Sequence, residues 1–355
     1  TFATAKQAGT AEPAKTAYMF NPVKVQKKRK MKLKKKNIFI ILMSVFILMT
    51  ATPDILVPAA SAGIRLWGLK VVPGLIMGLI FVGCLDYYMP QSSAYGTFLV
   101  ILCSLLCGFP TGALNCIQYS RRHNNNSFIA DIMPYCNTSS PGFTINYIYY
   151  GLLSDYINIR AFLICTYMPV ILLILCEWFK KRINTSRDIK HINMSKNKQH
   201  LTIPQNNKKN TDYQKQSHTP HTNMNFSDIL NNSIGKTACS ILKLGGYIII
   251  FSCISAYIER FAYNSPTAGV LLCGVLEITN GMYMAAGLQL SSYIKVIIIL
   301  LINAFGGIST LMQTCGIIKD NLGYSIDTRQ YIKSKLKLVL CTLLVTYITR
   351  KCGLI

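Results

Sequence analysis

Long apolar segments separated by short polar ones dominate the chain from about residue 38 onward. A helix needs about 20 residues to cross an apolar layer about 30 Å thick. The runs that approach or exceed this length are residues 38–57, 71–85, 97–114, 161–179, 243–258, 268–288, 294–318 and 336–348. The sequence lacks the short alternating segments of a strand barrel. The pattern therefore predicts an all-α polytopic membrane protein.

A glycine-interrupted module occurs twice. The tetrapeptide LLCG that ends at Gly108 returns 166 residues later, ending at Gly274. A pair of glycines nine residues apart also recurs, as Gly142 with Gly151 and then as Gly307 with Gly316. Apolar segments interrupted at corresponding places in two halves point to the binding site of a secondary transporter. We therefore expect two membrane repeats, residues 63–179 and 233–355.

Three further regions complete the organisation. Residues 1–30 are polar, and we predict a disordered extension before Met31, which resembles a natural start. Residues 31–62 contain the first transmembrane segment. It is either a signal anchor or a signal peptide cleaved after the Ala-Ser-Ala of residues 60–62. Residues 180–232 are rich in Asn, Lys, Gln, His and Thr without apolar periodicity, which predicts a disordered linker.

The net charge of +24 reports topology rather than a nucleic-acid partner. Residues 24–36 and 180–215 together hold 19 of the 37 Lys and Arg, and both stretches flank membrane segments. Basic residues at such places mark the cytoplasmic side. Surfaces that bind single-stranded nucleic acid interleave aromatic residues with their charges. We therefore expect a lipid bilayer and no nucleic acid as partner, with the linker in the cytoplasm.

Counting segments between the two basic stretches predicts a re-entrant element. Five candidate segments lie between them, so one must fail to cross if both are inside. Residues 132–153 are too polar for a lipid-exposed helix, and a re-entrant or broken helix accommodates them. Three crossings in each repeat would make the repeats inverted; parallel repeats are the alternative. This topology places five basic residues inside: Lys319, Arg329, Lys333, Lys335 and Lys337.

Two polar interruptions in the first repeat are candidate substrate-binding segments. The first is formed by Gly108, Phe109, Pro110, Thr111 and Gly112. Proline removes a backbone donor and glycine allows close approach, so the motif frees backbone groups for a polar substrate. A kinked helix packed on its neighbours would explain the motif equally well.

The second interruption is the densest polar cluster at membrane depth. Its members are Asn137, Thr138, Ser139, Ser140 and Gly142. The hydroxyls and the amide can donate to an anion, and a half-helix beginning near Pro141 would add its positive end. The alternative is a loop outside the membrane.

The second repeat contains a carboxylate within an apolar segment. Such a charge is expensive in the membrane and is usually functional. Glu277 could bind a coupling cation, carry a proton or accept hydrogen bonds from the substrate, with Thr279 and Asn280 beside it. An acid at a helix end near the membrane surface is the alternative reading.

A final interruption corresponds to the polar cluster of the first repeat. Its candidate residues are Asn303, Gly306, Gly307, Ser309 and Gln313. The Gly-Gly pair could instead serve close helix packing. We expect this interruption to meet residues 137–142 near the middle of the membrane.

Other chemistries find little support in the sequence. All five histidines lie in hydrophilic segments, and no two lie at metal-ligand spacing with a carboxylate. The thirteen cysteines lie mostly in apolar segments and are expected to be buried free thiols. A phosphate-binding glycine-rich loop is absent. We therefore expect no enzyme activity, no cofactor and no metal.

The four motifs resemble those of a known family. They are GFPTGA from Gly108, YCNTSSPGF from Tyr135, GVLEITNG from Gly274 and FGGIS from Phe305. In this order they resemble the YlbJ/SpoVV family of sporulation integral membrane proteins, which carry nucleoside-recognition (Gate) domains and are similar to concentrative nucleoside transporters. The polar residues 120–127 and the long linker depart from the family pattern. The resemblance implies movement of dipicolinate across the outer forespore membrane during endospore formation.

The expected function is therefore transport of a small organic anion, with dipicolinate as the substrate that the resemblance implies. The residues themselves leave alternatives open: a nucleoside or another small solute, or a membrane scaffold for spore assembly that transports nothing. The cell membrane is an alternative location to the outer forespore membrane. An oligomer is compatible with the sequence.

The linker offers a direct test of this topology. A single cysteine introduced near residue 205, in a background without native cysteines, should react with a membrane-impermeant thiol reagent only from the cytoplasmic side. Labelling of intact cells and of inside-out vesicles measures this. Reaction only from the outside would contradict the topology.

Overall fold

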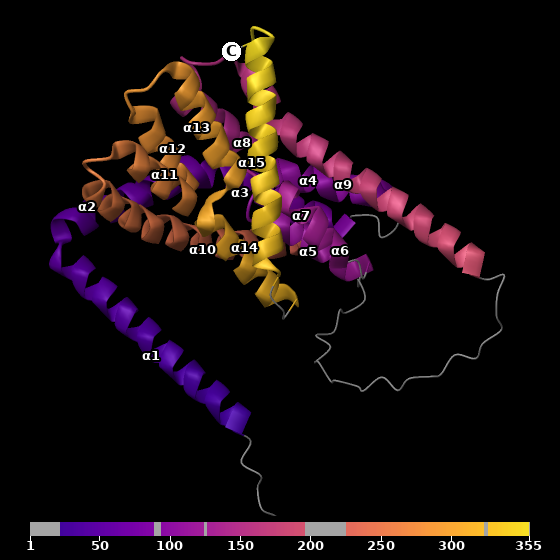
Figure 1. Ribbon diagram of the computed structural model, residues 1–355, viewed down its shortest axis with the longest axis horizontal. Coiled ribbons are helices and arrows are strands. Elements are labelled where there is room, and N and C mark those ends of the chain that lie inside the picture. The colour runs from indigo at the N-terminus through magenta and orange to yellow at the C-terminus, as the bar shows by residue number, and fades with distance from the viewer. Residues whose placement is uncertain (1–21, 89–93, 124–125, 196–224, 323–325, 355) are drawn as a thin grey trace, which may run out of the picture. The chain divides into compact units, whose positions relative to one another are not determined.

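The computed structural model is helical throughout the residues that it describes, 22–88, 94–123, 126–195, 225–322 and 326–354. The chain divides into two compact units, residues 1–53 and 54–355, and each is described by itself. The first unit contains α1 (Pro22–Ala51), so helix begins within the extension predicted to be disordered; residues 1–21 lie outside the described part. The second unit contains both predicted repeats (Figure 1).

The first repeat contains a long helix, two interrupted helices and a second long helix. The long entry helix is α2 (Pro53–Arg65), η1 (Leu66–Val71) and α3 (Val72–Tyr88) without a gap. The first interrupted helix is α4 (Ala94–Cys107) and α5 (Thr111–His123). After α6 (Asn126–Asp131), the second is α7 (Met133–Cys136) followed by α8 (Pro141–Phe143) and η2 (Thr144–Leu153). The exit helix is α9 (Ile159–Ser195).

The second repeat has the same order of elements. Its entry helix is α10 (Phe226–Phe261). Two interrupted helices follow, α11 (Pro266–Leu276) with α12 (Ile278–Gly287) and α13 (Ser292–Phe305) with α14 (Gly307–Leu322). The chain ends with α15 (Thr328–Lys351). We call the four interruptions break 1 (residues 108–110), break 2 (137–140), break 3 (Glu277) and break 4 (Gly306).

Local chemistry explains where the helices stop. Gly108 and Gly306 have φ values of 68° and 84°, in the left-handed region that ends helices and favours glycine. Pro110 follows Gly108 closely and precludes continuation of α4, and the Phe109–Pro110 peptide bond is cis. At break 2, Ser140 accepts a hydrogen bond from the Phe143 backbone N–H and Pro141 occupies the first helical position.

Length and apolarity make four helices candidates for crossing a membrane: Pro53–Leu85, Ile159–Lys180, Phe226–Phe261 and Ser292–Lys319. Three shorter apolar helices are Asn37–Ala51, Gly96–Cys107 and Pro266–Leu276. Of the eight apolar runs, residues 97–114 and 268–288 are divided by breaks 1 and 3, and residues 38–57 contain one of the shorter apolar helices. The last run, residues 336–348, belongs to α15, which also carries several lysines and does not reach the apolarity of a span.

The helices also narrow the predicted linker. α9 continues to Ser195 and α10 begins at Phe226, so helix occupies both ends of residues 180–232. An ion pair joins Glu177 and Lys180, one turn apart, at 3.7 Å near the predicted boundary. Residues 196–224 lie outside the described part, and the cytoplasmic location of the linker stays a prediction.

The two repeats pack through their long helices. α10 packs against α3, and α15 packs against α9. On η1, the Trp67 indole N–H donates to the backbone oxygen of Ile241 in α10 at 3.1 Å, and its ring lies where a Cβ on Gly245 would be. Large apolar side chains point outward on α9, α10 and α15, among them Leu175, Leu242 and Leu344. Such exposed apolar surface suits a lipid environment.

A close glycine contact joins the two arms of the α11–α12 helix. A Cβ built on Gly281 would lie 2.2 Å from the Cα of Gly274 and 2.5 Å from its nitrogen. Backbone atoms cannot move aside as a flexible side chain can. Gly274, the glycine of the repeated LLCG motif, therefore serves close helix packing here, and glycine is required at position 281.

Gly281→Ala should destabilise the protein by about 1–3 kcal/mol, because overpacking forces backbone shifts. Gly287→Ala is the matched control: it lies in the same helix with open space around its Cβ position. The control should be neutral or stabilising by up to about 1 kcal/mol. Thermal unfolding in detergent, followed by fluorescence-detected gel filtration, compares the two. Equal stabilities of the two variants would contradict the close contact.

Candidate functional site

Residues at or beside all four breaks line one small cavity, which we call the inner cavity. Its volume is about 20 Å³, which is room for about one water molecule. The polar lining comes from both repeats: Ser140 from break 2, Glu277 and Thr279 from break 3, and Ser309, Thr310 and Gln313 from α14. The apolar lining is Val71, Leu75, Phe109, Phe143, Leu244 and Ile248. Phe109 brings break 1 to the same cavity.

Breaks 1 and 2 touch each other through their backbones. The Phe109 N–H donates to the Thr138 oxygen at 2.7 Å. A Cβ on Gly108 would lie 2.3 Å from the Ser140 nitrogen, and one on Gly112 would lie 2.6 Å from the Cys136 oxygen. The two glycines therefore permit a backbone contact that a residue with a side chain would block. The hydrogen bond from Phe109 to Thr138 satisfies one backbone group of each break.

Glu277 forms break 3 and caps the helix that follows. Its backbone is extended, and its carboxylate accepts hydrogen bonds from the Asn280 backbone N–H and the Thr279 hydroxyl, both at 2.8 Å. The side chain is 3% exposed. A Cβ on Gly307 would lie 3.1 Å from the Leu276 oxygen, so breaks 3 and 4 also meet through the backbone. Glu277 is thus both a helix cap and a wall of the inner cavity.

Glu277 is compensated by hydrogen bonds and not by a lysine. Within the described residues, its polar contacts come from Thr279 and Asn280. Lys295, a basic residue at a segment end of the same repeat, lies instead over the Tyr156 ring at 5.2 Å. A buried carboxylate that accepts hydrogen bonds and borders a cavity can receive a cation, a proton or a hydroxyl donor.

Break 2 meets the second repeat through side chains, so the two interruptions are in contact, while their position near the middle of the membrane stays a prediction. The Ser139 hydroxyl donates to the Asn303 side-chain oxygen. The Asn137 amide donates to the Thr314 hydroxyl at 2.8 Å and to the Tyr331 hydroxyl at 2.9 Å. Break 2 is therefore tied to α13, α14 and α15.

Lys335 requires a correction. Charge counting placed it with the cytoplasmic basic residues, but it is 2% exposed and donates to the backbone oxygen of Asn137 at 2.7 Å. Its neighbours Lys333 and Lys337 are exposed, which is why a charge count misassigns it. The sequence did contain a signal, because Lys335 shares a helix face with the buried Tyr331, Leu338 and Thr342.

Several predicted residues support the site without lining the inner cavity. Thr111 is buried, and Gly142 packs on Gly74, whose backbone oxygen would lie 3.1 Å from an added Cβ. Asn280 donates from its side chain to Ser252 in α10 at 3.0 Å. Gly306 lies beside Lys335 at the end of α13.

A second small cavity, of about 10 Å³, is bordered by Thr138 and Ser139 of break 2. Its polar lining is Thr138, Ser139, Thr166, Asn303 and Thr342. Adjacent residues of break 2 therefore border two different cavities, Ser139 this one and Ser140 the inner cavity.

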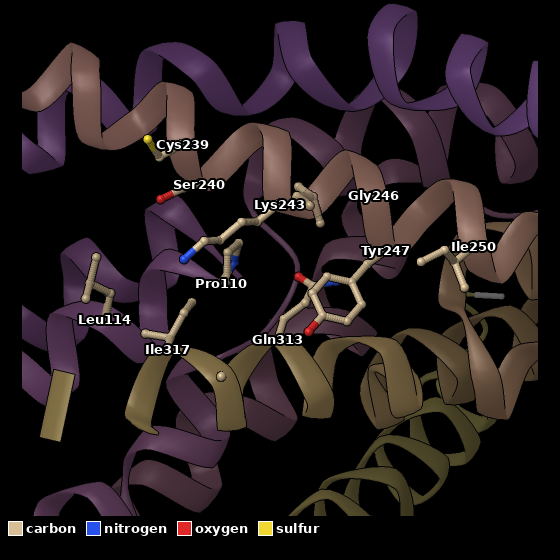
Figure 2. A pocket seen from close by; sticks show the side chains of 12 residues that line it. Pro110, Leu114, Cys239, Ser240, Lys243, Gly246, Tyr247, Ile250, Gln313 and Ile317 are labelled. Atoms are coloured by element: carbon tan, nitrogen blue, oxygen red, sulfur yellow. The ribbon is translucent and has the colours of Figure 1, made fainter. Parts of the chain in front are cut away.

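Figure 2 shows the lining of a larger space, which we call the outer vestibule. Its volume is about 520 Å³. The lining residues are Pro110, Leu114, Cys239, Ser240, Lys243, Leu244, Gly246, Tyr247, Ile250, Gln313, Gly316 and Ile317. Leu244 and Gln313 line both spaces. The sequence patterns did not indicate the α10 wall of this space, although Ser240, Lys243 and Tyr247 recur at helical spacing.

The chemistry of this region is that of hydrogen bonding and charge. The described residues contain no group of three or more His, Cys, Asp or Glu that could hold a metal ion. The side-chain oxygens of Gln313 and Asn137 are buried without a hydrogen-bond partner among the residues that the structure describes. Buried polar atoms of this kind are costly unless something satisfies them.

Comparisons with protein-family models, with curated proteins and with solved structures found no match for this chain.

The bond between Ser139 and Asn303 can be measured by a double-mutant cycle. Ser139→Ala and Asn303→Ala should each destabilise the protein, because each leaves a buried polar partner unsatisfied, at a cost of about 1–3 kcal/mol. The double variant should lose less than the sum, with a coupling of about 0.5–1.5 kcal/mol. Thermal or denaturant unfolding in one detergent gives all four values. Additive effects would mean that the two side chains do not interact.

Proposed function

We propose that this protein is an integral membrane transporter of a small organic anion that acts during endospore formation. Dipicolinate, moving across the outer forespore membrane, is the leading substrate because of the motif resemblance. One observation carries the proposal: residues at or beside four helix breaks, two from each repeat, line one small cavity with polar and apolar walls, beside a space of about 520 Å³.

Broken helices inside an apolar bundle are the reason to favour transport. Backbone irregularity at membrane depth persists where it is buried in protein or lines a cavity. Secondary transporters use such discontinuous helices, brought together from two repeats, to bind substrate. The matching order of long and broken helices in residues 63–179 and 233–355 supports two related repeats. We propose that their topology is inverted.

The lining favours an anion that travels with a cation or a proton. Hydroxyls of Ser140, Ser309 and Thr310 can donate to a carboxylate. The Glu277 carboxylate borders the same cavity and would repel an anion unless its charge were neutralised. A coupling cation or proton at Glu277 resolves this conflict, so the proposed cycle couples the anion to a positive charge.

A nucleoside is the second candidate substrate, and Glu277 and Gln313 favour it. A carboxylate and an amide oxygen accept hydrogen bonds from ribose hydroxyls or a base amine without charge repulsion. The two candidates differ in charge, which makes them easy to separate by experiment.

Flux into liposomes that contain only this protein tests the proposal. Labelled dipicolinate and labelled uridine are offered to matched proteoliposomes and protein-free liposomes. The proposal expects saturable dipicolinate uptake that exceeds uridine uptake. Saturable uptake of uridine alone would establish the nucleoside reading, and uptake of neither would favour a scaffold.

Glu277→Gln should lower saturable flux at least tenfold while costing stability no more than about 1 kcal/mol. The neutral amide removes the charge that holds a cation or proton, but its oxygen can still cap α12. Initial uptake rates and unfolding temperatures measure the two effects separately.

Glu259→Gln is the control, because Glu259 is an exposed acid on α10 outside the inner cavity. It should change neither flux nor stability. Unchanged flux with reduced stability in Glu277→Gln would show that Glu277 acts only as a helix cap.

A further inference from the structure

Lys335 is a buried cation at the junction of two helix breaks. Its side chain is 2% exposed and projects from α15. The ammonium donates to the backbone oxygen of Asn137, in break 2, at 2.7 Å. Its nitrogen also lies 3.8 Å from the position that a Cβ on Gly306 would take, at break 4. One ammonium therefore adjoins an interruption of each repeat.

The ends of two helices supply partial negative charge at this position. α7 ends at Cys136 and α13 ends at Phe305, and the last carbonyl groups of an α-helix have no partner within it. α13 is 14 residues long, so its C-terminal end carries the negative pole of a helix dipole, which favours a nearby cation. The Asn137 oxygen and the end of α13 thus provide a place for positive charge.

α15 also holds Asn137 through a second side chain. The Tyr331 hydroxyl accepts a hydrogen bond from the Asn137 amide at 2.9 Å. The Lys335 nitrogen lies 5.9 Å from the centre of the Tyr331 ring, whose face attracts a cation. The side-chain oxygen of Asn137 has no hydrogen-bond partner among the described residues. Asn137 therefore offers a further buried acceptor in the residue that the ammonium already binds.

We infer that these groups form a binding site for a small monovalent cation, and that the Lys335 ammonium occupies it as a tethered ligand. Burying an ammonium is costly unless polar groups compensate it, and here a backbone oxygen, a helix end and a ring face do so. The ammonium in turn pairs a backbone group that break 2 leaves open. The inference goes beyond the proposed function, because this cation stays in the protein and is distinct from one that binds at Glu277.

A vacated site should accept a free cation of matching size. Lys335→Ala removes the atoms of an n-propylammonium ion, which is therefore the probe. Propan-1-ol has the same size without the charge, and tetramethylammonium has the charge without an N–H donor. The three additives separate a cation site from an apolar cavity and from an effect of ionic strength.

Lys335→Ala should lower the unfolding temperature by about 4 °C or more, because a buried hydrogen bond to a charged group is lost. n-Propylammonium chloride should restore at least about half of this loss, since a ligand that binds the folded state raises its stability. Propan-1-ol and tetramethylammonium chloride at the same concentration should not. Thermal unfolding in detergent, followed by fluorescence-detected gel filtration, measures each midpoint.

Lys333→Ala is the matched control, because Lys333 is exposed on the same helix. It should keep the wild-type unfolding temperature and should not respond to n-propylammonium. Lys335→Met fills the space with an uncharged side chain, and its lowered unfolding temperature should not recover with any additive. Wild-type stability in Lys335→Ala or Lys335→Met would overturn the inference. So would recovery of Lys335→Ala with propan-1-ol equal to that with n-propylammonium, or no recovery with either.

A Lys335→Ala protein too unstable to purify still gives an answer. Membranes are then extracted with each additive present, and the yield of monodisperse protein replaces the unfolding temperature. A yield that n-propylammonium raises no more than propan-1-ol does would overturn the inference. Neither measurement needs transport, so the two proposals fail separately. Recovery with n-propylammonium but no flux in the wild type would remove only the proposed function, and saturable flux without recovery would remove only the cation site.

Discussion

The arrangement of this protein depends on how broken helices satisfy their own backbone groups. In an apolar environment every free N–H and C=O needs a partner, and a helix break exposes several at once. Breaks 1 and 2 meet this requirement together, through the bond from Phe109 to Thr138 and the glycine contacts at residues 108 and 112. Breaks 3 and 4 also approach each other closely, since a Cβ on Gly307 would lie 3.1 Å from the Leu276 oxygen. The polar lining of the inner cavity follows from this pairing of breaks.

The two buried ionisable groups near the breaks, Glu277 and Lys335, bind backbone groups of opposite kinds. Glu277 accepts the N–H groups that a helix N-terminus leaves unpaired, while Lys335 donates to a carbonyl left unpaired where α7 ends. Both lie beside the Gly306–Gly307 pair: a Cβ on Gly307 would lie 3.4 Å from the Glu277 Cα, and one on Gly306 would lie 3.8 Å from the Lys335 nitrogen. An acid and a base therefore lie near break 4, and each compensates a partial charge of the backbone: Glu277 at the start of α12 and Lys335 at the end of α7.

Much of this arrangement could be predicted from the sequence. Glycine and proline end helices by restricting or freeing the backbone, so residues 108–112 and 303–307 revealed their breaks directly. The paired order of motifs also indicated which breaks would correspond. The position of Lys335 could not be read in this way, because charge counting treats all lysines near a segment end alike. Whether such a lysine faces the interior or solvent depends on the neighbouring helix, as α7 shows for Lys335.

The contacts around the breaks differ in kind within and between the repeats. Within a repeat the backbones of the two breaks approach each other closely, at glycines whose positions leave little or no room for a side chain. Between the repeats they touch through side chains, as in Ser139 with Asn303, Asn137 with Thr314 and Tyr147 with the Thr279 oxygen. Side-chain hydrogen bonds can change partners by rotation about single bonds, whereas interlocked backbones cannot. We therefore expect each pair of breaks to move as a unit, and any sliding between the repeats to pass through the polar groups that line the cavities.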